Sequence, residues 1–209
     1  MEALRIAVIL AGLWCVSALI ALYFGTKAYG KRHLYSVPAG EAAAGIRYAF
    51  LQGMAPQAKE SVRMNLPSYA AGILFHSGVF VAFGLLAAHL VKFALPALAL
   101  WAMAILALTG ALGGLILLIK RLAMPLLRGL SCPDDYLSNA LATGFGMLAG
   151  LTVFIGGLER IWLSEAALLL VYLPMGKIRH CLFFFPTRFH LGAFFGRRGV
   201  LPGSGPNHG

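Results

Sequence analysis

The chain has 209 residues, of which 60% are hydrophobic and 11% are charged, and its mean hydropathy is +0.82. This composition is far more apolar than that of a soluble domain and indicates an integral membrane protein. The formal net charge of +10 would suit a nucleic-acid-binding protein. However, the basic residues flank apolar stretches, so we expect them to contact anionic lipid headgroups of the bilayer and no nucleic acid.

Five apolar stretches are long enough, or nearly so, to cross a membrane as helices, given about 20 residues per crossing. They lie at about 4–24, 68–91, 96–119, 137–158 and 161–180. Pro174, Lys177 and Arg179 interrupt the end of the fifth stretch. We therefore predict an all-α integral membrane protein with five transmembrane helices. It forms a single membrane domain over residues 1–209, with a loop at 25–67 and a tail at 181–209.

The basic residues predict the orientation of these spans. Six of the 17 Lys and Arg residues lie between the first two spans, three lie between the third and fourth, and five lie at or beyond the end of the fifth. They are Lys27, Lys31, Arg32, Arg47, Lys59 and Arg63; Lys120, Arg121 and Arg128; and Lys177, Arg179, Arg188, Arg197 and Arg198. The positive-inside rule assigns this side to the cytoplasm. The N-terminus is then outside and the C-terminus inside.

Two segments outside the spans have membrane-interface character. EAAAGIRYAFLQG, residues 41–53, predicts a short amphipathic helix on the inner membrane face or against a partner. FFFPTRFHLGAFFGRRG, residues 183–199, combines aromatic and arginine residues, as an interfacial anchor leading into a docking surface would. The cysteines Cys15, Cys132 and Cys181 form no cluster, so they cannot by themselves hold zinc or an iron–sulfur centre.

Histidines within the apolar spans are the first candidates for a functional site, because ionisable groups are costly in hydrocarbon. His76 lies in GILFHSGVF, residues 72–80, and His89 follows on the same predicted helix. Thirteen positions separate them, about 20 Å along a helix, so they cannot serve one cofactor. His180, at the inner end of the fifth span, shares the cytoplasmic depth of His76.

Two histidines from different helices at one depth are the usual ligand pair of a b-type haem in a helical bundle. Gly72, Gly78 and Ala82 would make room beside the first of them. An interhelical hydrogen bond is the alternative role for a single histidine in a membrane helix.

Three short motifs resemble those of the haem b (gamma) subunit family of respiratory nitrate reductase. This family includes the related membrane haem subunits of heterodisulfide reductase and dissimilatory sulfite reductase-associated complexes. The motifs are LFHSG at 74–78, RLAMPLLRGLSCPDD at 121–135 and LPMGKIRH at 173–180. Their order and the predicted topology also agree with the family, over roughly residues 66 to 185.

The resemblance implies that His76 and His180 are the axial ligands of one haem b near the cytoplasmic side. Nitrate reductase subunits hold a second, distal haem through two further histidines. Leu86 and Trp162 stand at those positions here, so a second haem is not expected, although Met147 is a conceivable soft ligand.

Other polar residues could serve the haem or a quinone. Arg121, Arg128, Lys177 and Arg179 could pair with haem propionates, with Arg128 and Arg179 preferred. Alternatively, they are helix-end residues that set the topology. His89 could bind a quinone carbonyl and exchange its proton, or it could simply face lipid headgroups at the outer interface.

We therefore expect an electron-transfer subunit of a membrane oxidoreductase complex in a bacterial or archaeal cytoplasmic membrane. It would relay electrons between a quinone, plausibly menaquinone, and a cytoplasmic iron–sulfur subunit, and would itself be non-catalytic or quinone-reacting. The alternative function is a haemless membrane anchor for a cytoplasmic enzyme. A transporter is disfavoured, because neither inverted repeats nor several intramembrane charges are evident.

Overall fold

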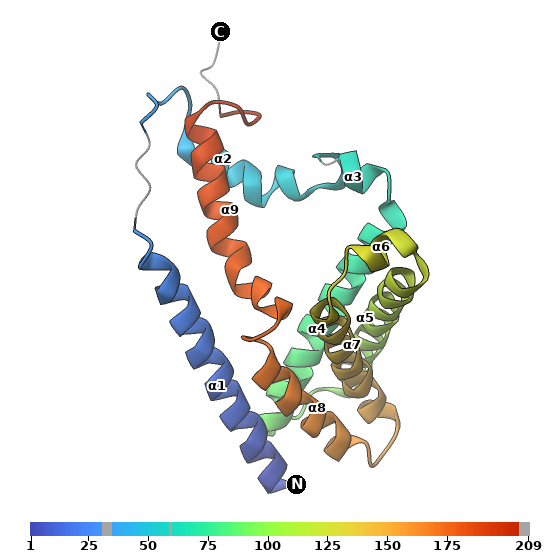
Figure 1. Ribbon diagram of the computed structural model, residues 1–209. Coiled ribbons are helices and arrows are strands. Elements are labelled where there is room, and N and C mark those ends of the chain that lie inside the picture. Colours follow the sequence, from blue (N-terminus) through green and yellow to red (C-terminus); the bar gives the residue numbers. More distant parts are fainter. Residues whose placement is uncertain (31–34, 59, 205–209) are drawn as a thin grey trace. The chain divides into compact units, whose positions relative to one another are not determined.

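The computed structural model describes residues 1–30, 35–58 and 60–204 (Figure 1). Within these residues the chain forms helices joined by turns and loops, with no strand. The α-helices are α1 (Glu2–Lys27), α2 (Ala42–Phe50), α3 (Glu60–Arg63), α4 (Leu66–Leu90), α5 (Ala97–Ala123), α6 (Pro125–Gly129), α7 (Pro133–Phe154), α8 (Glu159–Tyr172) and α9 (His180–Arg197). The 3₁₀ turns are η1 (Gln52–Met54), η2 (Pro56–Ala58) and η3 (Lys177–Arg179). Lys31, Arg32 and Lys59, used above to predict orientation, lie outside the described residues.

The predicted all-α class and the first four predicted spans are confirmed as helices. Among the described residues, α1, α4, α5 and α7 are each long and apolar enough to cross a membrane. A fifth span is counted only if α8 and the helical segment after it are taken together as one broken span. The predicted short helix within 41–53 is also present, as α2.

The prediction of one continuous helix over 161–180 is wrong. The helix α8 ends at Tyr172, and a turn that contains Pro174 and Gly176 separates it from η3 and α9. Proline has no amide hydrogen to donate to the preceding helical turn, so it favours a break here. Most of the predicted tail at 181–209 is helical, because α9 runs from His180 to Arg197.

The chain divides into two compact units, which are described separately. The first unit comprises Met1–Ala18 and Pro67–Ile178, and the second comprises Leu19–Leu66 and Arg179–Gly209. In the first unit, α4, α5, α7 and α8 surround a core in which Phe145 and Leu163 are fully buried (Figure 1). The start of α1 joins this core through Val8.

Glycines bring the helices of the first unit into close contact. Gly78 of α4 and Gly110 of α5 face each other, and a Cβ atom added to Gly110 would lie 2.5 Å from the Cα atom of Gly78. On the opposite side of α5, a Cβ atom on Gly150 of α7 would lie 2.8 Å from the carbonyl oxygen of Ala104. In a membrane, removal of apolar groups from water does not drive helices together. Small residues stabilise the bundle instead, because they let the helix backbones pack closely. These glycines therefore serve the close packing of α4, α5 and α7.

The second unit is built on the contact between α2 and α9. Gly45 of α2 packs against Gly192 and Gly196 of α9, with backbone against backbone. At one end of this contact the Ala39 amide donates to the Arg197 carbonyl (2.9 Å). At the other end the Arg188 guanidinium lies 3.4 Å from the Ala49 carbonyl. This packing explains why the aromatic, arginine-containing segment is helical.

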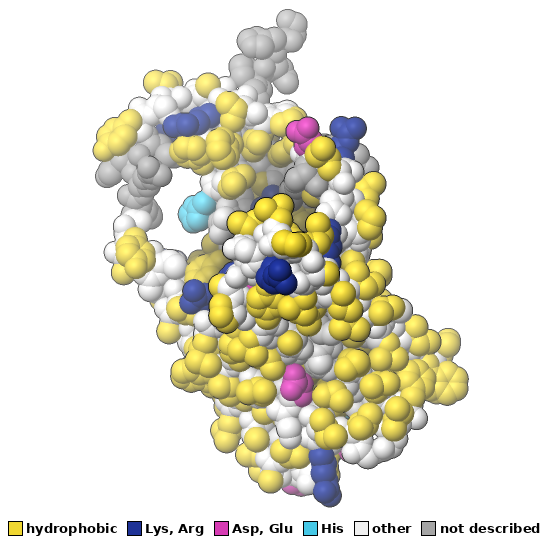
Figure 2. All heavy atoms as spheres, turned by 45° about the vertical axis from the view of Figure 1, so that its right-hand side comes forward, with side chains coloured by type: hydrophobic (Ala, Val, Ile, Leu, Met, Phe, Trp, Pro, Cys, Tyr) yellow, Lys and Arg dark blue, Asp and Glu magenta, His cyan; other side chains and the backbone are white. Residues whose placement is uncertain are grey.

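The exterior is largely apolar. On the face shown in Figure 2, hydrophobic side chains predominate, and charged side chains are few and scattered. On α1, Leu10, Leu13 and Val16 are 60%, 61% and 56% exposed. Contiguous exposed apolar surface is rare on soluble monomers and marks a membrane or protein contact. The helices therefore have the surface expected of a multi-pass membrane protein.

Replacing Gly110 with alanine should loosen the contact between α4 and α5. The new methyl group would collide with the Gly78 backbone, and overpacking of this kind typically costs about 1–3 kcal/mol. Gly12→Ala is the matched control, since nothing lies within 4 Å of a Cβ atom there and alanine favours helix by up to about 1 kcal/mol. Thermal unfolding of the purified protein in detergent should show a lower midpoint for Gly110→Ala only. Equal midpoints for the two variants would contradict the close contact.

Candidate functional site

His76 lies in the interior of α4 with its imidazole orientation set by the helix itself. Its Nδ1 lies 2.7 Å from the carbonyl oxygen of Gly72, one turn earlier. A carbonyl oxygen can only accept, so Nδ1 is the donor and carries a hydrogen. Imidazoles that bind metals commonly donate their other N–H to a carbonyl or carboxylate in this way. The His76 side chain itself is exposed on α4.

The small residues predicted to flank His76 have different roles. Gly72 borders open space, since nothing lies within 4 Å of a Cβ atom built there. Gly78 instead packs against Gly110, and Ala82 is completely buried in the core. The prediction that all three make room beside His76 is therefore wrong for Gly78 and Ala82. Residues two and six positions further along a helix point to other faces of it.

The second predicted haem ligand, His180, belongs to the second unit, whereas His76 belongs to the first. His180 is the first residue of α9 and its side chain is exposed. Arg179, a predicted propionate partner, directly precedes it in η3 and is exposed as well. Each histidine is thus presented at the surface of an apolar helix.

Two other predicted propionate partners bind a carboxylate of the protein. Lys177 Nζ donates to Asp135 Oδ2 over 2.7 Å, and Arg121 lies 3.6 Å from Asp135 Oδ1. Arg121 also donates to the Ser131 hydroxyl over 2.8 Å. We call these four residues the Asp135 cluster. It connects the end of α5, the start of α7 and the segment after α8. Arg128, the fourth predicted partner, lies exposed on α6 and is not a member.

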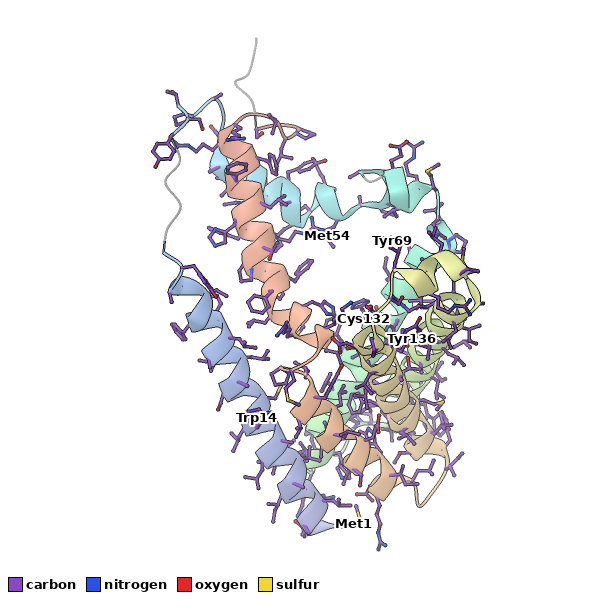
Figure 3. All side chains as sticks on the ribbon, in the orientation of Figure 1. Met1, Trp14, Met54, Tyr69, Cys132 and Tyr136 are labelled. Carbon is purple, nitrogen blue, oxygen red and sulfur yellow. The ribbon has the colours of Figure 1, made fainter. Side chains whose placement is uncertain are left out.

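The acidic start of α7 caps its helix. The Cys132 amide donates to Asp135 Oδ2 over 3.0 Å, in the first turn (Cys132 is labelled in Figure 3). Asp134 accepts from the Lys177 amide over 2.9 Å and from the Ser138 hydroxyl over 3.1 Å. A carboxylate at a helix N-terminus satisfies amides that have no partner within the helix and interacts favourably with the helix dipole. The motif at 121–135 therefore has a structural role in this unit.

His89 lies at the far end of α4 in a second polar group. Its Nε2 atom is 2.9 Å from Glu159 Oε1, at the start of α8, and Arg5 of α1 is 3.8 Å from the same oxygen. The His89 ring packs edge to face on Trp162, with ring centroids 5.5 Å apart. We call Arg5, His89, Glu159 and Trp162 the His89 cluster. The alternative prediction, that His89 simply faces headgroups, does not fit these protein contacts.

Within the described part of the chain, three buried nitrogen atoms of this cluster have no hydrogen-bond partner. They are Arg5 Nε, His89 Nε2 and Trp162 Nε1. The approach of His89 to Glu159 is close but does not have hydrogen-bond geometry. Trp162 is only 3% exposed, so bulk solvent does not reach its N–H. Because buried polar groups are nearly always hydrogen-bonded, the cluster is suited to a ligand that presents oxygen acceptors.

The sequence predicts His89 as a site residue, but it does not predict the residues that contact His89. Leu86 and Trp162, the positions of the distal haem ligands in the resembling family, are both buried in the core, and Met147 is exposed on α7. Arg5 and Glu159 were not predicted as site residues. The signal was available, because antiparallel spans place the start of α1, the end of α4 and the start of α8 at the same side of a membrane.

Comparison of the chain with protein-family models, curated proteins and solved structures finds no match. The residues described above are therefore the basis on which a function can be inferred.

Replacing Asp135 with alanine should lower the thermal unfolding midpoint more than replacing Lys177 with glutamine does. Asp135 is only 14% exposed and joins two cations and a helix amide, whereas the Lys177 side chain is 52% exposed. Exposed ion pairs contribute little to stability, but loss of a helix cap typically costs about 0.5–2 kcal/mol. Thermal unfolding in detergent measures both variants. An equal or larger effect of Lys177→Gln would show that the cluster is held by its surface ion pair alone.

Proposed function

We propose that this chain is the haem b electron-transfer subunit of a quinone oxidoreductase complex. It would relay electrons between a membrane quinone, such as menaquinone, and an iron–sulfur subunit docked on its cytoplasmic face. In this proposal the N-terminus is outside, the C-terminus is inside, and the membrane is a bacterial or archaeal cytoplasmic membrane. Substrate chemistry beyond the quinone belongs to the partner subunits.

The observation that carries the haem assignment is the state of His76. A histidine within an apolar span is costly and usually has a function, and the Gly72 carbonyl holds the Nδ1–H of His76 as metal-binding imidazoles commonly have their other N–H held. His180, exposed at the start of α9, is the proposed second ligand. A haem b bound in this way supplies one-electron transfer, and ligation by two histidines leaves no coordination site for a substrate.

The four basic residues expected near the propionates divide into two pairs. Arg121 and Lys177 bind Asp135, so their positive charge is already partly balanced. Arg128 and Arg179 are exposed, which supports them as the propionate partners. Arginine is well suited to this role because its planar guanidinium binds carboxylates in a bidentate manner.

The His89 cluster supports a quinone site. A quinone headgroup is apolar except for its carbonyl oxygens, which only accept hydrogen bonds, and the cluster offers buried donors on Arg5, His89 and Trp162. Oxidation of a quinol to a quinone releases two protons and two electrons. Proton acceptors are therefore required beside the headgroup, and His89 and Glu159 are adjacent to each other there.

Haem content tests the first half of the proposal. Pyridine haemochrome analysis of the purified complex, normalised per copy of this chain, should give one haem b for the wild type. His76→Ala and His180→Ala should each lose it, because a haem with a single axial imidazole is held weakly. His190→Ala is the matched control, since His190 lies on α9 but outside the three motifs.

The outcomes separate the candidate functions. Haem retained in both His76→Ala and His180→Ala would refute the ligand assignment. A wild-type complex without haem, which still assembles and turns over when His76 is replaced, would leave the membrane anchor as the function.

Quinone binding tests the second half. Replacing His89 with phenylalanine keeps a ring against Trp162 but removes a donor, so the dissociation constant of a short-chain naphthoquinone should rise about tenfold. Trp162→Phe should weaken binding similarly, by removing a buried N–H. Lys92→Gln is the control, since Lys92 lies at the same end of α4 but is 68% exposed. Calorimetry in detergent measures all three, and unchanged affinity in both ring variants would refute the site.

A further inference from the structure

Glu165 is an acidic residue in the middle of α8 to which neither the haem nor the quinone site assigns a role. It lies six residues after Glu159 and seven before Tyr172. At about 1.5 Å per residue, the carboxyl group is about 9 Å or more from either end of the helix. If α8 is part of a membrane span, Glu165 lies well inside the hydrocarbon region. An ionisable residue at that depth usually has a function.

The surroundings of Glu165 make room for its side chain but offer no charge to neutralise it. The facing residue on α7 is Gly144, and a Cβ atom built there would lie 3.2 Å from Glu165 Oε1. Among the residues that the structure describes, Glu165 makes no ion pair or hydrogen bond. The carboxyl group is thus accommodated by a glycine rather than by a cation.

The other charged and titratable groups of the neighbouring helices lie toward the two ends of α8. At one end are Glu159 and Arg160 of α8, His89 of α4, Lys92 just after α4, and Glu2 and Arg5 of α1; at the other are Asp134 and Asp135 of α7, Arg121 of α5 and Lys177. Trp162 lies between, one helical turn before Glu165, and its buried Nε1 has no partner among the described residues. Glu165 is therefore the titratable group one turn along α8 from the His89 cluster.

A carboxylate without a counter-ion in hydrocarbon is strongly disfavoured, so the protonated acid is the stable form at this position. A protonated carboxyl group beside a quinone site can deliver its proton when a negative charge develops on the quinone oxygen, and can recover it when quinol is oxidised. Reduction of a quinone to a quinol consumes two electrons and two protons. The electrons come from the partner subunits, and the protons must pass through groups within the protein.

We propose that Glu165 is a proton-carrying carboxyl group of the quinone site, which exchanges one proton with the bound headgroup at the His89 cluster. This inference rests on the proposed quinone function. It assigns two proton routes to the site: the contact between His89 and Glu159 for one proton, and Glu165 for the other. It also explains why a glycine faces an acidic side chain within the interior of a helix pair.

Labelling with dicyclohexylcarbodiimide tests this assignment directly, because this apolar reagent reacts with protonated carboxyl groups in apolar surroundings and not with carboxylates. The intact complex in detergent is treated over a range of pH, with and without the short-chain naphthoquinone, and the adduct is located by peptide mass spectrometry. We expect the adduct on Glu165, with a yield that falls as the pH rises and that falls severalfold when naphthoquinone is bound. Glu60, which is exposed and outside the candidate spans, is the internal control and should stay unlabelled.

Glu165→Gln, which preserves the shape of the side chain, should abolish the adduct while leaving haem content and thermal unfolding unchanged. The inference is overturned if Glu165 is not labelled, if its labelling is independent of pH, or if a naphthoquinone that binds by calorimetry does not protect it. In each of these cases the proposed quinone function still stands. If naphthoquinone does not bind to the wild type at all, both the inference and the quinone function fail.

Discussion

The backbone contact between α4 and α5 at Gly78 and Gly110 is the constraint on which the rest of the first unit depends. In a membrane, apolar side chains gain little by leaving lipid for protein, so close packing and polar contacts between helices must hold the bundle together. The absence of side chains at these glycines sets the rotation of α4 about its axis. With Gly78 turned toward α5, His76 is exposed on a different face of the helix.

The polar residues of the first unit collect at its two ends, and the two ends differ in kind. At one end, the carboxylates of Asp134 and Asp135 accept hydrogen bonds from a helix amide, a lysine and a serine, so charges and donors are matched. At the other end, the carboxylates of Glu2 and Glu159 contact Arg5 and His89, yet three buried nitrogen atoms of the His89 cluster remain without a hydrogen-bond partner among the described residues. A saturated cluster stabilises a fold, whereas an unsaturated buried cluster has capacity for a ligand. This difference favours the His89 end as the ligand-binding one.

Much of the fold could be predicted from hydropathy alone, because a membrane span requires a long apolar run and the first four runs are uninterrupted. The bounds of the fifth helix could not be predicted, because Pro174 and Gly176 end α8 early. The contact of Gly192 with Gly45 of α2 then supports a separate helix, α9, which runs beyond the predicted end of the span.

Of the candidate site, the histidines could be identified because imidazoles are conspicuous in apolar sequence. Arg5 and Glu159 could not be paired with His89 without knowing which faces of α1, α4 and α8 meet. Glu165 could not be predicted as a site residue, because a single acidic residue near the end of a predicted span is typical of the membrane–water interface.

In the proposed electron carrier, the two histidines of α4, thirteen residues apart, have different roles. His76 donates its Nδ1–H to a backbone carbonyl, which suits it to the proposed role of haem ligand. His89 contacts a carboxylate and a tryptophan ring, so it can gain or lose a proton beside a bound headgroup. Electrons can tunnel across the roughly 20 Å of helix between such sites only if a cofactor shortens the gap, while protons must stay where titratable groups are. Electron and proton movements would therefore separate along α4, and this separation is how a membrane subunit can couple quinone chemistry to a transmembrane charge difference.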